Sequence, residues 1–335
     1  MVLTISPGGK EYDVTVEAGC LNRASELFDL GRKCLVVTDD GVPGKYAEKI
    51  VAQCKEPVLV TLHQGEESKS MKNLEKLLTV MLNHSFTRGD CAVAVGGGMP
   101  GDLAGFAAAT YMRGIDFYNV PTTLLSQADS SIGGKTAVDL GGVKNIVGAF
   151  HQPSGVLIDT DTLETLSARQ RAAGLAEIIK SGLIADADLF SYIEENIAGG
   201  LDMGRIIEEA LQVKKKVVEE DERESGLRRI LNFGHTIGHG IESVTGLLHG
   251  ECVATGMIPM CSPEVRERLV PVLESAGLPV QAECDPEAVF EAATHDKKAA
   301  GGIIKTVYVP EPGKAEIIEM GPEDLRIRIN SICHI

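Results

Sequence analysis

In the first half of the chain, short β-branched runs alternate with segments of helical periodicity. The apolar runs are KCLVVTD, PVLVTL, CAVAV, FYNVP and GVLIDT, and helical patterns over 46–54, 71–82 and 102–109 follow the first three. Because strands separated by helices pair in parallel within one sheet, this order predicts an α/β domain with a parallel Rossmann-like sheet. Ahead of it, VLTISPGG and YDVTVEAG predict a hairpin around residues 7–9.

After Thr160 the pattern changes to helices almost throughout. We therefore expect an amino-terminal α/β domain over 1–160 and a mostly α-helical, metal-binding carboxy-terminal domain over 161–335, with a late hairpin in IIKTVYVPEPGKAEIIEM. The segment from Gln127 to Lys144 has little periodicity and many Gly, Ser and charged residues. It is expected to form a long functional loop.

The 335 residues carry a formal net charge of −16, which argues against nucleic acid or an anionic membrane as a partner. The first twenty residues lack the basic start and apolar core of a signal peptide, and no later run is long enough to span a bilayer. We therefore expect a cytoplasmic protein. The eight cysteines include no CxxC pair and are expected to be reduced structural thiols.

The run GGGMPGD, at 96–102, follows CAVAV and leads into a helical pattern. Glycines allow backbone N–H groups to approach a pyrophosphate, and the following helix offers its positive end. A tight turn that needs glycine for steric reasons alone is the alternative. Two further elements favour a dinucleotide site: GEESK, with Glu66 and Lys69 ahead of a helix, and Thr122 and Thr123 after FYNVP.

The run SSIGGKT superficially resembles a phosphate loop, but it lacks the GxxxxGK[ST] spacing, which disfavours a nucleoside triphosphatase. Lys135 in this run, and Lys144 with Asn145, are instead candidate donors to an anionic small molecule. For either lysine alone, an ordinary surface charge is the alternative.

The segment over 224–251, ESGLRRILNFGHTIGHGIESVTGLLHGE, concentrates arginine, asparagine and histidine at helical spacing. On a continuous helix that advances about 100° per residue, five polar side chains share one arc of roughly 80°: Arg228, Asn232, His235, His239 and Glu242. A solvated helix face is the alternative, but these groups ligate metals, form directional hydrogen bonds or titrate near neutrality.

GLAEIIKSGLI places Glu177 and Lys180 on one face of an otherwise apolar short helix. A carboxylate there is expected to be buried, and Lys180 or a metal can be its partner; a simple ion pair is the alternative. With His235, His239 and His249, Glu177 offers the mixed shell typical of zinc. HTIGH is not HExxH, which disfavours a metalloprotease. Spacing leaves open whether both His235 and His239 ligate or one moves protons.

Several isolated cations complete the set, and surface solvation is the alternative for each: Lys214 in KKK, Arg228 beside Arg229, and Lys297 in HDKKAAGG. Together with a cofactor turn and a metal shell, they indicate a phosphorylated or carboxylated polyol as the substrate.

Seven runs, in order, resemble the 3-dehydroquinate synthase family: GGGMPGDLAGFAAATYMRG, PTTLLSQADSSIGGKT, KNIVGAFHQP, GLAEIIKSGLI, DERESGLRRILNFGHTIGH, HGE and DKK. The matches extend from about Glu66 to Lys298. The resemblance implies a homodimer that uses NAD and a divalent metal, zinc or cobalt. It also implies the second step of the shikimate pathway, in which a phosphorylated keto sugar acid, 3-deoxy-arabino-heptulosonate 7-phosphate, gives 3-dehydroquinate and phosphate. Transient oxidation by NAD, phosphate elimination, re-reduction and aldol closure make up that reaction.

The resemblance further implies roles for individual residues. The metal ligands are Glu177, His235 and His249, with Glu242 as structural support. Residues that hold NAD are Asp39, Glu66, Lys69, Gly97, Gly98, Asp102, Thr122, Thr123, Leu125, Asp129, Lys135, Lys144, Thr165 and Leu166. Catalytic and substrate-binding residues are Lys135, Lys144, Asn145, Lys180, Lys214, Arg228, Asn232, His239 and Lys297, with Glu224 orienting Arg228 and Arg113 contributed across the dimer.

Three alternatives remain. A metal-dependent glycerol or alcohol dehydrogenase shares the domain order and the glycine turn, but it would release NADH. Another sugar phosphate cyclase would act on a different heptose or hexose phosphate. A nucleotide-binding regulatory protein would keep the fold without the chemistry.

Overall fold

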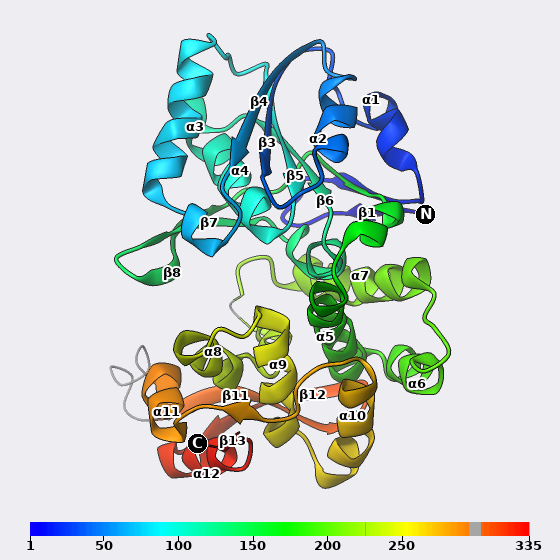
Figure 1. Ribbon diagram of the computed structural model, residues 1–335, viewed down its shortest axis with the longest axis vertical. Coiled ribbons are helices and arrows are strands. Elements are labelled where there is room, and N and C mark those ends of the chain that lie inside the picture. Colours follow the sequence, from blue (N-terminus) through cyan, green and yellow to red (C-terminus); the bar gives the residue numbers. More distant parts are fainter. Residues whose placement is uncertain (225, 295–302, 335) are drawn as a thin grey trace. The chain divides into compact units, whose positions relative to one another are not determined.

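The computed structural model describes residues 1–224, 226–294 and 303–334 (Figure 1). Contacts within the chain divide it into two compact units, Met1–Leu166 and Ser167–Ile335. The expected boundary at residue 160 coincides with the first residue of a 3-10 helix, η5 (Thr160–Thr165), at the end of the first unit. The functional division into 1–160 and 161–335 stays a prediction.

The first unit contains a seven-stranded sheet in the order β1-β2-β9-β6-β5-β3-β4. Every neighbouring pair is parallel except the β1–β2 hairpin. The strands are β1 (Val2–Ile5), β2 (Tyr12–Val16), β3 (Lys33–Asp39), β4 (Glu56–Leu62), β5 (Cys91–Gly96), β6 (Asp116–Pro121) and β9 (Gly155–Ile158). The predicted parallel sheet and the amino-terminal hairpin are therefore confirmed.

Helices cover both faces of this sheet, because alternate residues of each buried strand point to opposite sides. In β3, Leu35 and Val37 pack in one apolar core with side chains of α3 and α4. Cys34 and Val36 pack in the other, with side chains of α2. The helices are α1 (Ala24–Leu27), α2 (Gly44–Val51), α3 (Met71–Asn83) and α4 (Gly98–Thr110), with the short turns η1 (Cys20–Arg23), η2 (Glu66–Ser68) and η3 (Tyr111–Arg113).

The prediction of a long loop over 127–144 is wrong. A π-helical turn, η4 (Ser126–Ser130), is followed by an antiparallel hairpin of β7 (Lys135–Leu140) and β8 (Val143–Phe150). Leu140 pairs with Val143, so Gly141 and Gly142 form a two-residue turn with φ of 62° and 81°. Such turns need positive φ, which glycine adopts without strain. The adjacent glycines were thus a hairpin signal that we interpreted as loop composition.

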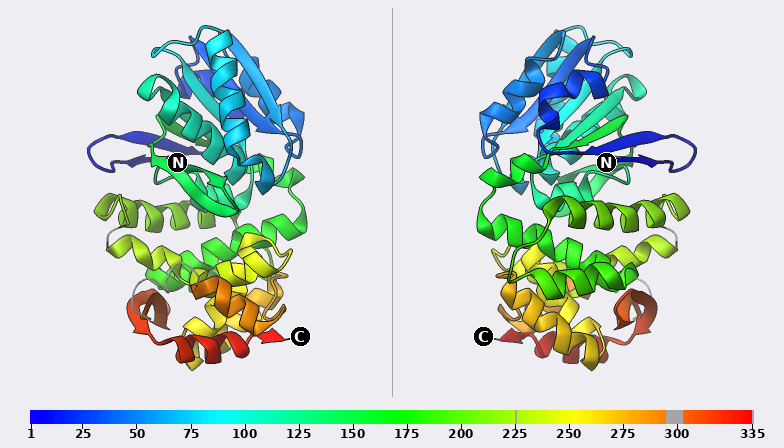
Figure 2. Two further views of the ribbon diagram at one scale, coloured as in Figure 1. Left: turned by 90° about the vertical axis from the view of Figure 1, so that its left-hand side faces the viewer. Right: turned by 90° about the vertical axis from the view of Figure 1, so that its right-hand side faces the viewer.

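The second unit is mostly helical (Figure 2), and the predicted late hairpin lies ahead of its last helix, where Figure 1 labels both strands. Its helices are α5 (Ala168–Ala185), α6 (Ala187–Asn196), α7 (Met203–Glu220), η6 (Leu227–Asn232), α8 (His235–Val244), α9 (His249–Met257), η7 (Ile258–Met260), α10 (Pro263–Ser275), α11 (Pro286–Thr294) and α12 (Pro322–Asn330). The hairpin joins β11 (Ile304–Glu311) to β12 (Lys314–Met320), and two short strands, β10 (Ala282–Glu283) and β13 (Cys333–His334), pair in parallel.

Two expectations concern the whole chain. Among the described residues, no helix is both long enough and apolar enough to cross a bilayer. All eight cysteines are free thiols, and six of them are buried, as expected for structural residues in a core.

Candidate active site

Three side chains predicted from the sequence converge around the ammonium group of Lys69 in the first unit. Lys69 lies between η2 and α3, and its side chain is 4% exposed. Its Nζ atom lies 2.5 Å from Asp102 Oδ2 on α4 and 3.5 Å from Glu66 Oε1, and it donates a hydrogen bond to Asn145 Oδ1 on β8. Burial lowers the pKa of Lys69, but Asp102 and Glu66 outweigh it and raise that pKa. The charged lysine therefore ties the β7–β8 hairpin to α4.

A second group of predicted residues lies at the carboxyl ends of adjacent parallel strands, where ligands bind in open α/β sheets. Asp39 ends β3, and Thr122 directly follows β6. The backbone N–H of Thr122 donates to Gly96 O of β5 at 2.8 Å. Gly97 precedes α4, whose amino terminus has no side-chain cap. Its first N–H groups can therefore meet phosphate oxygens, as a pyrophosphate site requires.

Asp39 is held by its own turn. Its Oδ1 accepts a hydrogen bond from Gly41 N at 2.9 Å. Burial raises the pKa of Asp39 despite this hydrogen bond.

The remaining predicted residues of this unit lie on other segments: Gly98 and Asp102 on α4, Thr123 and Leu125 before η4, Asp129 within it, Lys135 on β7, Lys144 on β8, Arg113 on η3, and Thr165 and Leu166 at the end of η5.

In the second unit, three helices bring one carboxylate and three imidazoles together. Glu177 comes from α5, His235 and His239 from α8, and His249 from α9. The three histidines each offer a nitrogen within 4.8 Å of the other two. Glu177 Oε1 lies 3.7 Å from His235 Nε2 and 3.5 Å from His249 Nε2. His239 therefore belongs to the same cluster, so geometry leaves its role open.

Two of the imidazoles are oriented by acceptors behind them. His235 Nδ1 donates to Phe233 O at 3.1 Å, and His249 Nδ1 donates to Glu242 Oε2 at 3.1 Å. With both Nδ1 atoms engaged, the Nε2 atoms face Glu177. Ligating histidines in metalloproteins are held in this way by an acceptor on the other ring nitrogen.

Glu177 is buried, as predicted, and it forms an ion pair with the equally buried Lys180. Neither carboxylate oxygen makes a hydrogen bond of normal geometry, which is unusual for a buried carboxylate. Burial would raise the pKa of Glu177, but Lys180 and His235 hold it well below its usual range. A divalent cation bound to these oxygens would complete the set of partners that a buried carboxylate needs.

His235 and His249, the two histidines oriented by acceptors, differ in charge. Burial and the positive charge of Lys180 lower the pKa of His235 to about 3, so its Nε2 lone pair is available at neutral pH. Burial also lowers the pKa of His249, but Glu177 and Glu242 outweigh it and raise that pKa to about 10. The carboxylates that hold a proton there would equally favour a divalent cation, whose binding displaces the proton. One carboxylate oxygen with two or three imidazole nitrogens fits zinc or cobalt.

A cavity of about 540 Å³ opens beside these histidines. Three cationic side chains line it together with polar groups: Arg223, Arg229 and Lys305, with Glu224, Asn232, His235, Thr236, His239 and Thr306. Glu224 Oε1 accepts a hydrogen bond from Asn232 Nδ2 at 2.6 Å. In a chain with net charge −16, this local excess of cations indicates an anionic ligand.

The family models for the amino-terminal and carboxy-terminal parts of 3-dehydroquinate synthase match residues 59–173 and 174–299. The chain is 42% identical to the 3-dehydroquinate synthase of Streptococcus pneumoniae over 339 residues, which covers 94% of this chain and 96% of that protein. It is 41% identical to the enzyme of Enterococcus faecalis, covering 98% and 99%. The chain belongs to the 3-dehydroquinate synthase family.

Solved structures confirm the fold class. A 2-deoxy-scyllo-inosose synthase, complexed with carbaglucose-6-phosphate, NAD+ and Co2+, matches with a TM-score of 0.90 at 26% identity, over 99% of this chain and 100% of that one. The 2-epi-5-epi-valiolone synthase of Streptomyces hygroscopicus subsp. jinggangensis, with NAD+ and Zn2+ bound, matches with a TM-score of 0.87 at 28% identity, over 96% of each chain. Both neighbours are, like the 3-dehydroquinate synthases, sugar phosphate cyclases.

One prediction about the metal-site segment of this family member is wrong. Residues 228–242 do not form one helix, because the chain breaks between η6 and α8. Gly234 adopts φ of 78°, and a Cβ atom there would lie 2.7 Å from Val253 O. A left-handed glycine that packs directly on a neighbouring backbone cannot continue a helix.

The break changes which arginine faces the cavity. In the 3-10 helix η6, residues three apart are eclipsed, so Arg229 rather than Arg228 shares a face with Asn232. Arg228 is 2% exposed; its backbone N–H donates to Asp221 Oδ2 at 3.0 Å and its Nη1 donates to Glu222 O. The expected substrate role of Arg228, and its orientation by Glu224, stay predictions.

The remaining family positions are quickly placed. Lys214 is buried on α7, not solvated as its neighbours in KKK suggested. Lys297 lies outside the described residues.

Three cationic residues of the cavity were not predicted from the sequence: Arg223, Arg229 and Lys305. For Arg229 the available signal was its spacing of three from Asn232, which matters only once a 3-10 helix is assumed.

Proposed function

We propose that the protein is an NAD- and divalent-metal-dependent 3-dehydroquinate synthase, a phosphorus-oxygen lyase that converts 3-deoxy-arabino-heptulosonate 7-phosphate to 3-dehydroquinate and phosphate. The observation that carries this proposal is the buried Glu177 carboxylate, which faces two oriented imidazoles next to a cation-lined cavity. Family membership supplies the substrate.

Each unit has its own task. In the first unit, the α4 amino terminus, Asp39 and the Lys69 cluster would hold the dinucleotide. In the second, Glu177, His235 and His249 would hold the metal, with His239 as the alternative fourth ligand. When bound, NAD supplies a reversible hydride acceptor and the divalent metal supplies polarisation of substrate oxygens.

The chain's own residues bind, orient and move protons. Arg229 and Lys305 are placed to bind the phosphate or carboxylate of the substrate. Asn232, held by Glu224, can donate to a substrate hydroxyl. His239 is exposed at the cavity, where its imidazole can take up or release a proton during ring opening and closure.

Phosphate release from 3-deoxy-arabino-heptulosonate 7-phosphate, with NAD at a small fraction of the substrate concentration, tests the function. We expect many turnovers per NAD, loss of activity in a chelator and recovery with Zn2+ or Co2+. Stoichiometric NADH accumulation without phosphate release would instead identify a dehydrogenase. Turnover of a hexose 6-phosphate in its place would identify another cyclase, a candidate raised by the neighbour that binds carbaglucose-6-phosphate.

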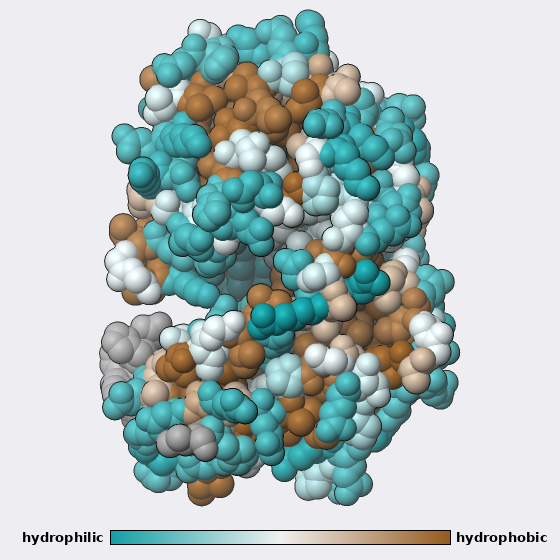
Figure 3. Space-filling view, in the orientation of Figure 1, coloured by the Kyte–Doolittle hydropathy of each residue, from teal (hydrophilic) through white to brown (hydrophobic). Residues whose placement is uncertain are grey.

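We further propose a cytoplasmic homodimer. The β7–β8 hairpin exposes four large apolar side chains, between 47% and 60% exposed: Leu140, Val143, Ile146 and Phe150. Figure 3 shows hydrophobic residues on this hairpin. Apolar groups gathered on one hairpin are typical of a protein interface, and β8 is an edge strand that a second copy could pair with. Arg113 would then reach the partner's site.

Sedimentation of a charge variant tests the dimer. We expect Ile146→Glu to dissociate the protein into monomers. The matched control, Leu82→Glu, changes a side chain that is 69% exposed on α3 and should leave the dimer intact. A dimeric Ile146→Glu would remove this hairpin from the interface.

A further inference from the structure

The first turn of α9 contains a carboxylate with an unusually complete set of donors. Glu251 is the third residue of the helix that begins at His249, and its side chain is 8% exposed. Its Oε2 accepts a hydrogen bond from Leu248 N at 2.7 Å. Arg169 of α5 grips both oxygens, with Nε 2.6 Å from Oε1 and Nη2 2.7 Å from Oε2. Such bidentate pairs fix geometry as well as adding attraction.

Gly250, between His249 and Glu251, allows the start of α9 to pack directly on the backbone of α5. A Cβ atom on Gly250 would lie 1.9 Å from Ala173 O of α5, a distance that no side chain can accommodate. The first turn of α9 therefore rests on the α5 backbone at Gly250, while the Arg169–Glu251 pair holds it one residue further on. The sequence HGE thus combines a candidate ligand, a close contact and an anchor.

Both elements joined by this anchor carry metal-site residues. Glu177 follows Arg169 by eight residues on α5, a little over two turns, and His249 is the first residue of α9. The gap of 3.5 Å between His249 Nε2 and Glu177 Oε1 therefore depends on how the start of α9 sits on α5. Glu242 aims the imidazole of His249, whereas the Arg169–Glu251 pair places its backbone.

We infer that Arg169 and Glu251 are positioning residues of the metal site, which set the separation of Glu177 and His249 without touching metal or substrate. The inference rests on the proposed metal binding by these two side chains. Arg169 is 57% exposed, and exposed ion pairs contribute little to folding stability. Supporting residues of a metal site, in contrast, typically change metal affinity by about 10- to 100-fold. The effect of the Arg169–Glu251 pair on folding stability and its effect on metal affinity can therefore be measured separately.

Titration of the metal-free protein with Co2+, followed by visible absorption, tests the inference. We expect Arg169→Ala to weaken Co2+ binding about tenfold and to alter the absorption band, with Arg169→Lys in between. The matched control is Arg268→Ala. Arg268 makes the same bidentate contact from α10 to Glu194 of α6, with Nε 3.0 Å from Oε1 and Nη2 2.6 Å from Oε2, and its loss should leave Co2+ affinity unchanged.

Thermal unfolding of the metal-free variants separates structure from positioning. Small and similar shifts for Arg169→Ala and Arg268→Ala, with weaker Co2+ binding only in the former, support the inference. Equal Co2+ affinity and an unchanged band in Arg169→Ala and Arg169→Lys overturn it, and the proposed function then still stands. A wild-type protein that binds no Co2+ overturns the proposed function itself.

Discussion

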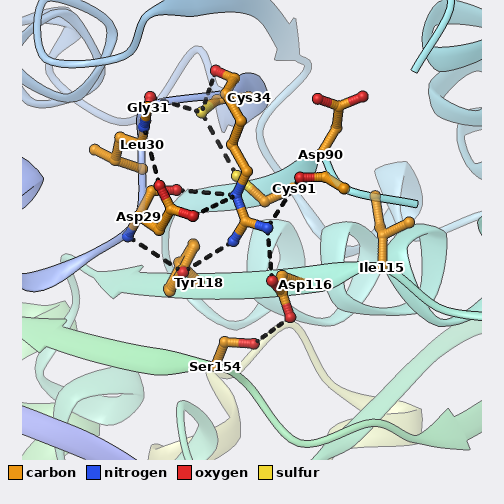
Figure 4. Close-up of polar contacts among 12 residues, drawn as sticks. Asp29, Leu30, Gly31, Cys34, Asp90, Cys91, Ile115, Asp116, Tyr118 and Ser154 are labelled. Atoms are coloured by element: carbon orange, nitrogen blue, oxygen red, sulfur yellow. Dashed lines mark hydrogen bonds and ion pairs between the residues drawn. The ribbon is translucent and has the colours of Figure 1, made fainter. Parts of the chain in front are cut away.

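Two charged side chains in this molecule are partnered in opposite ways: Arg32 is 16% exposed and well hydrogen-bonded, whereas Glu177 is buried and is not. Arg32, at the amino-terminal edge of the parallel sheet, donates to Asp29 O, Gly89 O and Tyr118 OH at 3.0 Å each, and its Nη1 lies 2.7 Å from Asp116 Oδ2 (Figure 4). Glu177, in the second unit, lies beside Lys180, His235 and His249, but neither of its oxygens makes a hydrogen bond of normal geometry.

The difference separates a structural charge from a functional one. Each nitrogen of the Arg32 guanidinium has an acceptor from strand ends or turns of its own unit, so Arg32 joins β3, β5 and β6. Glu177 is surrounded by groups that carry or can accept charge, His235 and His249 above all. A buried charge whose hydrogen-bonding capacity is not met by the protein is typical of a ligand-binding site.

The largest effect should come from Glu177→Gln, which keeps the volume and removes the charge. Because the ligand charge is lost, we expect kcat/KM for phosphate release to fall on the order of 1000-fold. Steady-state kinetics on protein shown to be folded by circular dichroism provide the measurement. A variant that retains more than a tenth of the activity would place the metal elsewhere.

Arg32→Met should lower stability and leave activity unchanged, the reverse of what we expect for Glu177→Gln. It removes the charged partner of Asp116 and the donor to two backbone carbonyls, Asp29 O and Gly89 O, so the free energy of unfolding should fall by about 2–3 kcal/mol. The kcat/KM of the folded protein should not change. Urea unfolding and kinetics on the same preparation check both, and lost activity at full stability would refute the structural role of Arg32.

Arg229→Ala and Lys305→Ala test the anionic character of the cavity. Each removes one charged contact to the substrate, which corresponds to a rise in KM of about tenfold with kcat largely kept. Lys314→Ala, at an exposed position of β12 paired with Glu311 and Glu316, is the matched control. Unchanged KM in both cavity variants would exclude this surface from substrate binding.

The smallest effect concerns pH. The pKa of His249 is raised to about 10 from 6.5 by Glu177 and Glu242, so its contribution to stability is complete below pH 6.5 and is lost as pH rises through 10. At Asp116, burial is outweighed by Arg32, which lowers the pKa; that contribution is lost only as pH falls through the acid range. The chelated protein should therefore lose stability as pH rises from 6.5 to about 8, below the ordinary pKa of a cysteine thiol.

His249→Asn should flatten that decline, and Arg32→Met should keep it. Urea unfolding at several pH values in chelator measures both slopes. A decline of the same slope in His249→Asn would assign the pH dependence to other groups.

Sequence patterns predicted what depends on short-range periodicity. The buried strand runs gave the parallel sheet, and the apolar neighbours of Glu177 predicted its burial. The errors arose where glycines with positive φ decide the local backbone. Gly141 and Gly142 close a hairpin that was taken for a loop, and Gly234 ends what was taken for one helix.

Sequence patterns could not predict the following contacts between distant segments. Arg169 and Glu251 are 82 positions apart, and no spacing rule connects them. Arg229 was visible beside Arg228, but the choice between them depends on whether η6 advances as a 3-10 helix or an α-helix. The orientation of His249 by Glu242 likewise required the turn between α8 and α9.

The most direct test of the central claim is a Co2+ titration of metal-free protein, monitored by visible absorption, for wild type, Glu177→Gln and Arg32→Met. If the incompletely satisfied carboxylate is the functional charge, wild type and Arg32→Met bind one Co2+ per chain with the same affinity, and Glu177→Gln loses the site. Equal Co2+ binding by Glu177→Gln and wild type would contradict the assignment of Glu177 and its histidines as the metal centre.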